Sequence, residues 1–197
     1  SNINFAQGDI LNLDKLDHRF DLIESSGVLH HMKDPLAGWR TLRNLLKQGG
    51  LMRIGLYSSK GRREWNGLRE VIPPNLDKER VTNFIRERRS RVLMKYIKGV
   101  DNVITNIADY YSLSGCRDLL FHENEIQFSI PQIDKIIADL NLRFLGFANL
   151  MESTKKTFKN RFNSSTDYYD LEKWDIFEQE YPNTFISMYQ FWCQAKD

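Results

Sequence analysis

The sequence lacks several features that would place the chain in a class at once. Its two cysteines, Cys116 and Cys193, lie far apart and outside any C-x-x-C spacing, which argues against a disulfide framework or a zinc knuckle. No apolar run approaches the roughly 20 residues that span a bilayer. The formal net charge is only +2, so bulk charge indicates neither a nucleic acid nor a membrane as partner. We therefore expect a cytoplasmic protein.

A second absence concerns glycine spacing. None of the 11 glycines forms a G-x-G pair, the spacing that brings a backbone close to a phosphate or cofactor. No Ser/His/Asp or Cys/His signature of nucleophilic catalysis is evident either. What the chain does have is 41% hydrophobic residues over 197 positions, which is enough for one packed domain, with or without an inserted lobe.

The first 58 residues show an α/β pattern. Short apolar runs predict strands over 3–7, 20–25 and 51–57. Asp34 and Pro35 are typical of a helix start, and Leu36, Trp39, Leu42 and Leu46 then fall on one face. Gly49 and Gly50 are expected to end this helix in a left-handed C-cap. Strand, helix and strand with tight connections predict parallel pairing.

The remaining sequence suggests an insertion and a return to α/β structure. Residues 59–127 are highly charged and predict a helical inserted lobe. From Ser129 a capping box starts a helix, a strand follows over 143–147, and a helix around Leu171–Phe177 precedes an aromatic strand over 185–194. We therefore divide the chain into a partial core (1–58), an inserted lobe (59–127) and C-terminal helix–strand units that complete the core (128–197).

Four blocks of the sequence carry a resemblance to a known family. They are Gly8-Asp9-Ile10, Phe20 through Asp34, Leu45 through Tyr57, and the aromatic stretch Thr184-Phe185 with Met188 through Trp192. Together they resemble a class I S-adenosylmethionine-dependent methyltransferase, closest to the type 11/12 methyltransferase domains of bacterial proteins that are sometimes linked to tetratricopeptide repeats. The resemblance implies a Rossmann-like sheet lacking its first two strands, with a helical insertion and an antiparallel last strand.

The resemblance also implies a cofactor, S-adenosyl-L-methionine, and residues that hold it. Asp9 would accept a hydrogen bond from the adenine amino group, and the main-chain N–H of Ile10 would contact the ring edge. The cofactor's sulfonium and amino-acid end would lie over the end of the second strand, and the residues that would contact this end are Glu24, Ser25, Ser26, Gly27 and Leu29. From the residues alone, Asp9 simply caps a turn, and the two serines are ordinary turn residues.

His30 and His31 are the candidates for a catalytic base. Imidazole titrates near neutrality and can take a proton from an oxygen or nitrogen acceptor. The alternative is that one ring is packed structurally, and a metal site with Asp34 is disfavoured because adjacent histidines rarely point at one ion. Methyl transfer otherwise needs alignment and exclusion of water, which explains the missing catalytic signature.

The methyl acceptor is not evident from the sequence, and it could be a small molecule or a macromolecule. Polar candidates for contact with it are Tyr110, Tyr111, Arg117 and His122, for which packing between short helices is the alternative. The alternative function is a nucleic-acid-binding or non-catalytic scaffold module. It would use a basic helix over 78–98, whose cations are Lys78, Arg80, Arg86, Arg88, Arg89, Arg91, Lys95 and Lys98. A nicotinamide-dependent oxidoreductase would need the missing glycine loop as well.

The absent glycine loop has a consequence for partners. In the family's topology the strand over 20–25 would have an open edge, because two strands that precede the present sequence lie beside it. An open edge favours pairing with another segment. We therefore expect this chain to be the C-terminal part of a catalytic domain, inactive in isolation, with a missing N-terminal segment or a second chain at that edge.

Overall fold

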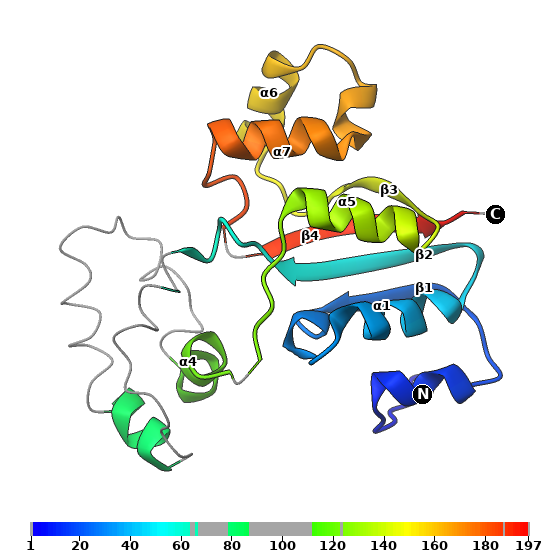
Figure 1. Ribbon diagram of the computed structural model, residues 1–197, viewed down its shortest axis with the longest axis vertical. Helices are drawn as coiled ribbons and strands as arrows, with labels where there is room; N and C mark the ends of the chain where they lie inside the picture. Colours follow the sequence, from blue (N-terminus) through cyan, green and yellow to red (C-terminus); the bar gives the residue numbers. More distant parts are fainter. Residues whose placement is uncertain are drawn as a thin grey trace. The chain divides into compact units, whose positions relative to one another are not determined.

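The computed structural model describes residues 2–63, 66, 79–86, 112–122, 124–186 and 188–196 (Figure 1). Its elements, in chain order, are the 3-10 helix η1 (Ile10–Lys15), strand β1 (Phe20–Ser26), the 3-10 helix η2 (Leu29–His31), helix α1 (Pro35–Asn44), β2 (Leu46–Tyr57), α4 (Leu113–Leu120), α5 (Ile130–Asp139), β3 (Leu142–Phe147), α6 (Glu152–Arg161), η5 (Thr166–Tyr169), α7 (Leu171–Glu180) and β4 (Met188–Ala195). The α/β class expected from the sequence is confirmed.

The described strands form one mixed sheet in the order β1-β2-β4-β3. β1 and β2 run parallel, with Glu24 opposite Arg53, as the strand–helix–strand pattern predicts. β4 runs antiparallel to both of its neighbours, so the predicted antiparallel last strand is present. β1 and β3 are the edges of this sheet.

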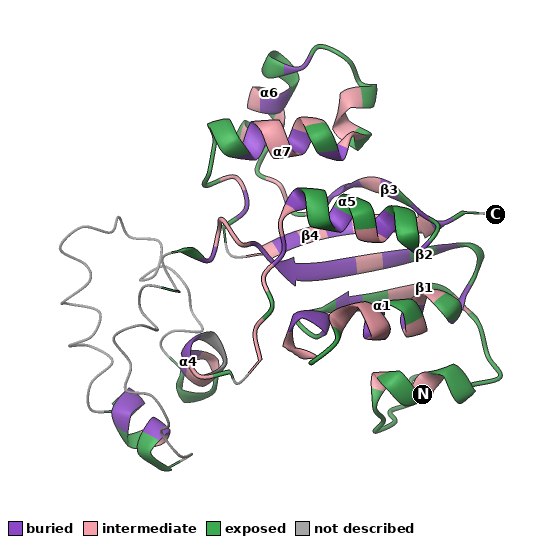
Figure 2. Ribbon diagram, in the orientation of Figure 1, coloured by how far each residue is buried: buried purple, intermediate pink, exposed green. Residues whose placement is uncertain are grey.

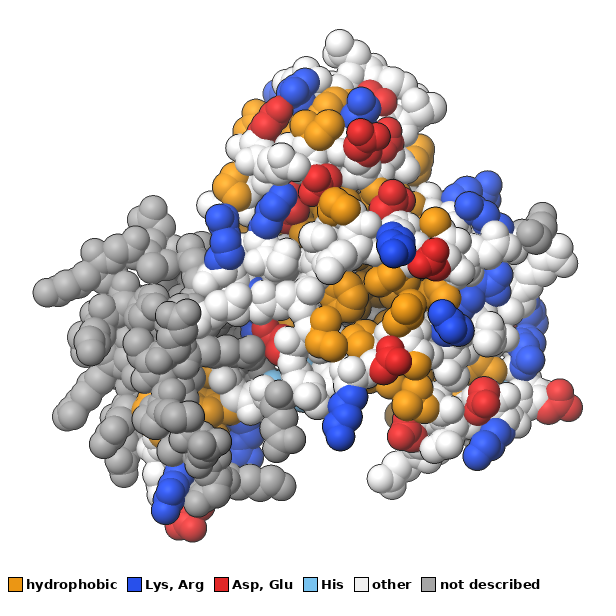
Figure 3. Space-filling view, in the orientation of Figure 1, with side chains coloured by type: hydrophobic (Ala, Val, Ile, Leu, Met, Phe, Trp, Pro, Cys, Tyr) orange, Lys and Arg blue, Asp and Glu red, His pale blue; other side chains and the backbone are white. Residues whose placement is uncertain are grey.

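Helices α1 and α5 lie on the same side of the sheet (Figure 1), and buried side chains of both helices and of the sheet form one core. Alternate residues of β2, namely Met52, Ile54 and Leu56, are fully buried, because successive side chains of a strand point to opposite faces. They share one hydrophobic cluster with Trp39 of α1 and Ile133 of α5. Figure 2 shows the burial along these elements, and Figure 3 shows hydrophobic side chains gathered over α1 and α5 on the viewed face.

Two expectations for the first 58 residues were wrong. Residues 3–7 form no strand, and Phe5 is 94% exposed, because an isolated extended segment without a neighbouring strand gains no ladder. α1 ends at Asn44, and β2 already begins at Leu46. Gly49, with φ of 68°, therefore lies inside β2 rather than at a helix end.

Gly49 lies at a break in the β1–β2 register. Phe20 pairs with Leu46, whereas Leu22 pairs with Leu51, so three extra residues of β2 are accommodated between two pairs. Such an irregularity needs a residue that tolerates positive φ. Pairing with β1 thus extends β2 back to Leu46, a residue that the sequence pattern had placed in the helix.

The last third largely follows the pattern. The capping box is present, with the main-chain N–H of Ser129 donating to Gln132 Oε1 at 2.8 Å. β4 starts at Met188, later than the expected residue 185. Helix α6 was not expected, because its sequence is polar apart from the buried Phe158.

The chain divides into two compact units, one formed by Ser1–Gly61 with Ile126–Asp197 and the other by Arg62–Glu125. The first unit holds the sheet. The second contains α4 and the helical residues 79–86, while most of the predicted basic helix over 78–98 lies outside the described residues. None of the described helices combines the length and the hydropathy that crossing a bilayer requires.

Candidate functional site: the corner after strand β1

The corner after β1 is formed by a tight, glycine-dependent turn. Gly27 follows the last residue of β1 with φ of 77°, a conformation that side chains with a Cβ rarely adopt. A Cβ built there would meet nothing within 4 Å, so only the backbone requires glycine. At the far end of the turn, Asp34 caps α1 by accepting a hydrogen bond from the Ala37 N–H at 2.9 Å. The local sequence thus fixes both ends of the corner.

We expect Gly27→Ala to lower the free energy of unfolding by about 1 kcal/mol, because alanine pays the left-handed penalty. Gly27→Asn should cost less than Gly27→Ala, since asparagine tolerates that conformation better. Urea unfolding of the three proteins measures both values. Equal costs for alanine and asparagine would contradict a purely backbone requirement.

The two histidines of η2 occupy different environments. His30 is fully buried, and its ring stacks on Tyr57 with centroids 3.8 Å apart and planes at 27°. His31 is half-buried and meets both rings edge-on, at 4.3 Å from His30 and 5.5 Å from Tyr57. His30 therefore has the packed arrangement that was the alternative for one of the pair, and His31 is the histidine with surface to offer a ligand.

The main chain around these rings is tied to the segment 126–128. The Ile126 N–H donates to the His30 carbonyl at 2.9 Å, and the Phe128 N–H donates to the Tyr57 carbonyl at 2.8 Å. The pairing continues where the Ser59 N–H donates to the Phe128 carbonyl, also at 2.8 Å. One short segment thus holds the histidine turn and the end of β2 together.

Ser25 and Ser26 end strand β1 on opposite faces of the sheet. Ser25 is 5% exposed, and its buried Oγ has no hydrogen-bond partner within the described residues. The Ser26 hydroxyl lies against Met188 Sδ at 3.8 Å. It also fills the space beside Gly55, where a Cβ would clash with Ser26 Oγ and come within 3.1 Å of Ser26 Cα. Gly55 therefore lets β1 and β2 approach closely at this end of the sheet.

The side chain of Glu24 forms an ion pair with a residue of the neighbouring strand β2. Its carboxylate pairs with Arg53 at 2.8 Å, and Arg53 also donates to Gln190 Oε1 at 2.8 Å. Asn149 extends this row by donating to the same oxygen at 2.7 Å. The side chain of Glu24 is therefore used within the sheet, so that a contact of Glu24 with a cofactor would come from its backbone.

Asp9 and Ile10 lie at the start of η1. Asp9 Oδ1 accepts a hydrogen bond from the Leu11 N–H at 2.9 Å, which is the turn-capping role open to it from the sequence. The hydrogen bonds of Asp9 stay within residues 9–12, so its Oδ2 is left for a ligand in the part of the chain that is described. Ile10 is half-buried and packs against the core. The side-chain hydrogen bonds of Asp9 do not reach the residues of the β1 corner.

The proposed acceptor contacts are only partly described. Arg117 of α4 donates to Thr82 Oγ1 at 2.6 Å, inside the unit Arg62–Glu125. His122 follows α4 and is exposed. Tyr110 and Tyr111 lie outside the described residues, and of the basic cluster only the exposed Arg80 and Arg86 fall within them.

A buried polar cluster at the end of β2 was not predicted from the sequence. Glu178 of α7 is fully buried and accepts hydrogen bonds from the Tyr189 hydroxyl at 2.8 and 2.9 Å and from the Ser58 hydroxyl at 3.3 Å. Lys60 Nζ lies 3.4 Å from Glu178 Oε2. Burial raises the pKa of Glu178, against the opposing effects of Tyr189 and Lys60. Burial together with the Glu178 carboxylate also raises the pKa of Tyr189.

A signal for this cluster was present in the sequence. Glu178 falls four residues after Trp174 and seven after Leu171, and these apolar residues of the predicted helix share one face with it. A carboxylate on an apolar stripe needs buried partners. Those partners, Ser58 just after β2 and Tyr189 in β4, could not be paired with it from spacing alone.

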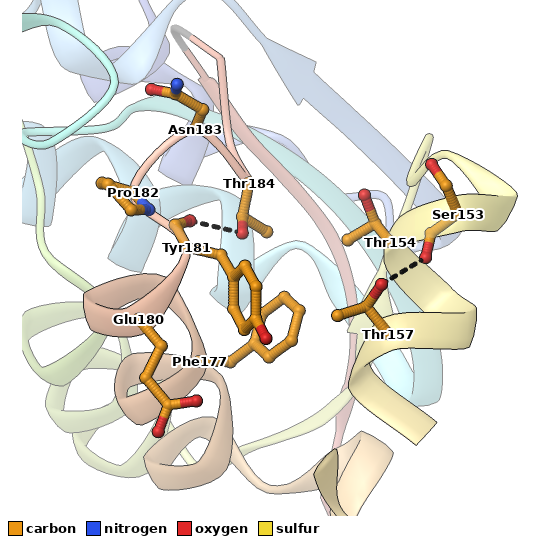
Figure 4. Close-up of a pocket in the computed structure, with 9 residues that line it drawn as sticks. All are labelled: Ser153, Thr154, Thr157, Phe177, Glu180, Tyr181, Pro182, Asn183 and Thr184. Atoms are coloured by element: carbon orange, nitrogen blue, oxygen red, sulfur yellow. Dashed lines mark hydrogen bonds between the residues drawn. The ribbon is translucent and has the colours of Figure 1, made fainter. Parts of the chain in front are cut away.

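A separate pocket of about 350 Å³ lies between α6 and the end of α7 (Figure 4). It is lined by Ser153, Thr154, Thr157, Phe177, Glu180, Tyr181, Pro182, Asn183 and Thr184. Two of its hydroxyls are turned to the backbone, since Thr157 donates to the Ser153 carbonyl at 2.9 Å and Thr184 to the Tyr181 carbonyl at 2.6 Å. None of the site residues predicted from the sequence lines this pocket.

The arrangement of the sheet and of the turn after β1 indicates the class of protein fold. A parallel β1–β2 pair, a glycine turn after β1 and an antiparallel β4 beside β2 agree with a Rossmann-like methyltransferase fold. A family model described as a methyltransferase domain matches residues 1–89. This match and the fold confirm the resemblance to class I S-adenosylmethionine-dependent methyltransferases.

Individual relatives are distant and longer than this chain. A protein of Synechococcus sp. is 26% identical over 184 residues, covering 87% of this chain and 43% of its own length. The structure of PKMT2 from Rickettsia typhi in complex with AdoHcy aligns with a TM-score of 0.55 at 15% identity, covering 96% of this chain and 38% of that one. A second structure of PKMT2 gives a TM-score of 0.54 at 16% identity, with 96% and 39% covered. The chain thus spans less than half the length of these relatives.

Proposed function

We propose that this chain forms part of the catalytic domain of an S-adenosyl-L-methionine-dependent methyltransferase in the cytoplasm. The observation that carries the proposal is the family match over residues 1–89, which includes both Asp9 and the β1 corner. The fold of the structurally similar PKMT2, which was solved with AdoHcy, supports the same reading.

The residues of the corner fit the proposed cofactor. Ser25 offers a buried hydroxyl with no other partner in the described part of the chain, and Gly27 leaves open space beside the turn. Asp9 keeps a carboxylate oxygen for an amino group, and an ionised acceptor strengthens such a hydrogen bond. When bound, S-adenosyl-L-methionine supplies a methyl group activated by a positively charged sulfur.

The protein's part in the reaction is alignment, exclusion of water and removal of a proton. Leu29 is fully buried at the start of η2 and gives the corner an apolar wall. His31 is half-buried beside it, and a neutral imidazole there would take the proton that the acceptor loses. We propose that His30 supports this role by packing and that residues of the unit Arg62–Glu125, including Arg117 and His122, select the acceptor.

We further propose that the edge of β1 receives another segment. In the described residues β1 pairs with β2 alone, and Leu22 on this strand is 53% exposed. An unpaired parallel edge favours the addition of a strand. Because no G-x-G pair occurs in these 197 residues, we propose that the added segment brings the glycine loop of the cofactor site.

Calorimetric titration with S-adenosylhomocysteine tests these proposals. We expect weak or undetectable binding by the 197-residue chain, and micromolar or tighter binding by the protein extended with a strand and G-x-G loop that pair with β1. In the extended protein, Asp9→Ala should weaken binding about tenfold to a hundredfold, since hydrogen bonds to charged groups contribute about 1.5–3 kcal/mol.

Asp14→Ala is the matched control, because Asp14 is an exposed residue of the same 3-10 helix. It should leave the affinity unchanged. Micromolar binding by the 197-residue chain would overturn the need for an added segment. Failure of the extended protein to bind S-adenosylhomocysteine would overturn the proposal that S-adenosyl-L-methionine is the cofactor.

A further inference from the structure

The end of strand β2 carries an aromatic residue that contacts both histidines of η2. Tyr57 is the last residue of β2 and is 8% exposed. Its ring stacks on that of His30 with centroids 3.8 Å apart and makes a T-shaped contact with the ring of His31 at 5.5 Å. The ring of Tyr57 is thus stacked on one histidine and T-shaped to the other.

The three rings form a corner that leaves His31 few orientations. His30 and Tyr57 are nearly parallel to each other, with planes at 27°. His31 stands steeply to both, at 67° to His30 and 87° to Tyr57. A rotation of the His31 ring would bring its face against one of these two neighbours, so the stack limits where its nitrogen atoms point.

The backbone holds this corner from behind. The Ile126 N–H donates to the His30 carbonyl at 2.9 Å, and the Phe128 N–H donates to the Tyr57 carbonyl at 2.8 Å. These hydrogen bonds hold the main chain of His30 and that of Tyr57 in place relative to one another. A side chain held in this way can transmit its position to the adjacent residue, His31.

We propose that Tyr57 is a positioning residue that orients the His31 imidazole through the His30 stack. The inference deepens the proposed methyl-transfer function and rests on it for the role of His31. A base acts only when its nitrogen lies within hydrogen-bond reach of the proton, so an orienting ring contributes without touching substrate. We assign this role to the ring of Tyr57.

Nuclear magnetic resonance of the 197-residue chain, labelled with carbon-13 at histidine Cε1, tests the proposal without requiring activity. The chain has four histidines, and His30→Gln and His31→Gln assign the two signals by their disappearance. In the unsubstituted chain we expect the His30 signal to be shifted upfield by the Tyr57 ring relative to free histidine. The His31 signal should be a single sharp line displaced from that of free histidine.

Two substitutions at Tyr57 separate ring from hydroxyl. Tyr57→Phe keeps the ring, and both signals should retain their positions. Tyr57→Leu removes it, and the His30 signal should move downfield toward that of free histidine. The His31 signal should shift and broaden as its ring samples several orientations. Tyr169→Leu is the control, because Tyr169 is 59% exposed in η5 and should move neither signal.

Interpretation of the histidine signals requires that the Tyr57 variants are folded. Circular dichroism must show that Tyr57→Leu is folded; if it is not, Tyr57→Val and Tyr57→Met are measured in its place. A folded variant whose His31 signal stays sharp and unmoved overturns the proposal, as does loss of the signal in Tyr57→Phe. Because the measurement uses no cofactor, its failure is distinct from a failure to bind S-adenosylhomocysteine, which would overturn the proposed function instead.

Discussion

Replacing Trp174 by alanine is expected to lower the free energy of unfolding by about 4 kcal/mol, the range for truncating a large buried aromatic side chain. Trp174 is fully buried in α7 and stacks on Phe158 of α6 with centroids 3.9 Å apart. Its Nε1–H also donates to the Tyr168 carbonyl at 3.0 Å. The substitution therefore leaves both a cavity and a carbonyl without its partner.

Urea unfolding followed by circular dichroism measures this loss. Tyr169→Ala is the control, because its side chain is 59% exposed in the neighbouring η5, and it should change the free energy by less than about 0.5 kcal/mol. A loss below about 1 kcal/mol for Trp174→Ala would mean that α6 and α7 do not pack around this residue as described.

Glu178→Ala is expected to cost about 3 kcal/mol, because it removes the partner of several buried groups at once. The Tyr189 hydroxyl, the Ser58 hydroxyl and Lys60 Nζ all converge on this carboxylate. Glu178→Gln keeps the shape and a carbonyl oxygen for Tyr189, so it should cost less than the alanine variant. Urea unfolding at neutral pH gives both free energies of unfolding. If the alanine variant were as stable as the glutamine variant, the described hydrogen bonds to Glu178 would be contradicted.

The same cluster predicts a pH dependence with a definite sign. The pKa of Glu178 is raised by burial above its ordinary value of 4.5. A carboxyl whose folded pKa is raised stabilises the fold fully below the unfolded pKa, and this stability is lost as pH rises through the folded value. Relative to Glu178→Gln, the unsubstituted chain should therefore lose stability as pH is raised above 4.5.

Glu180 on the same helix provides the opposite case. Arg161 forms a hydrogen-bonded ion pair with it at 2.8 Å and lowers its pKa. Relative to Glu180→Gln, the chain should lose stability as pH falls through that lowered value. Unfolding measured in urea from pH 3 upward separates the two trends, and a common sign for both glutamates would show that burial does not dominate at Glu178.

Local signals predicted much of the fold because they act over a few residues. The apolar run from Phe20, the Asp34 cap and the Ser129 capping box each correspond to an element that begins where expected. The start of β2 and the absence of a strand over 3–7 depend on which segments find a pairing partner. That information lies in the register with β1 and in residues far away in sequence, so local patterns could not supply it.

The candidate site divides along the same line. The glycine turn and the two histidines are consecutive in the sequence, and their proximity needed no structure. Tyr57 and the segment 126–128 reach them only through the sheet, and the Glu178 cluster joins β2, α7 and β4. Helix α6 was missed because a single apolar residue, Phe158, meets the core from an otherwise polar sequence, which leaves no periodic stripe.

The exposed border of β1 has a practical consequence. Within the described residues the strand has main-chain groups paired on one side only, and the apolar Leu22 stands beside them. Strands of this kind template association between copies at high protein concentration. Handling the 197-residue chain at low concentration, or blunting the border with Leu22→Lys, should keep it dispersed, and light scattering over a concentration series would reveal the difference.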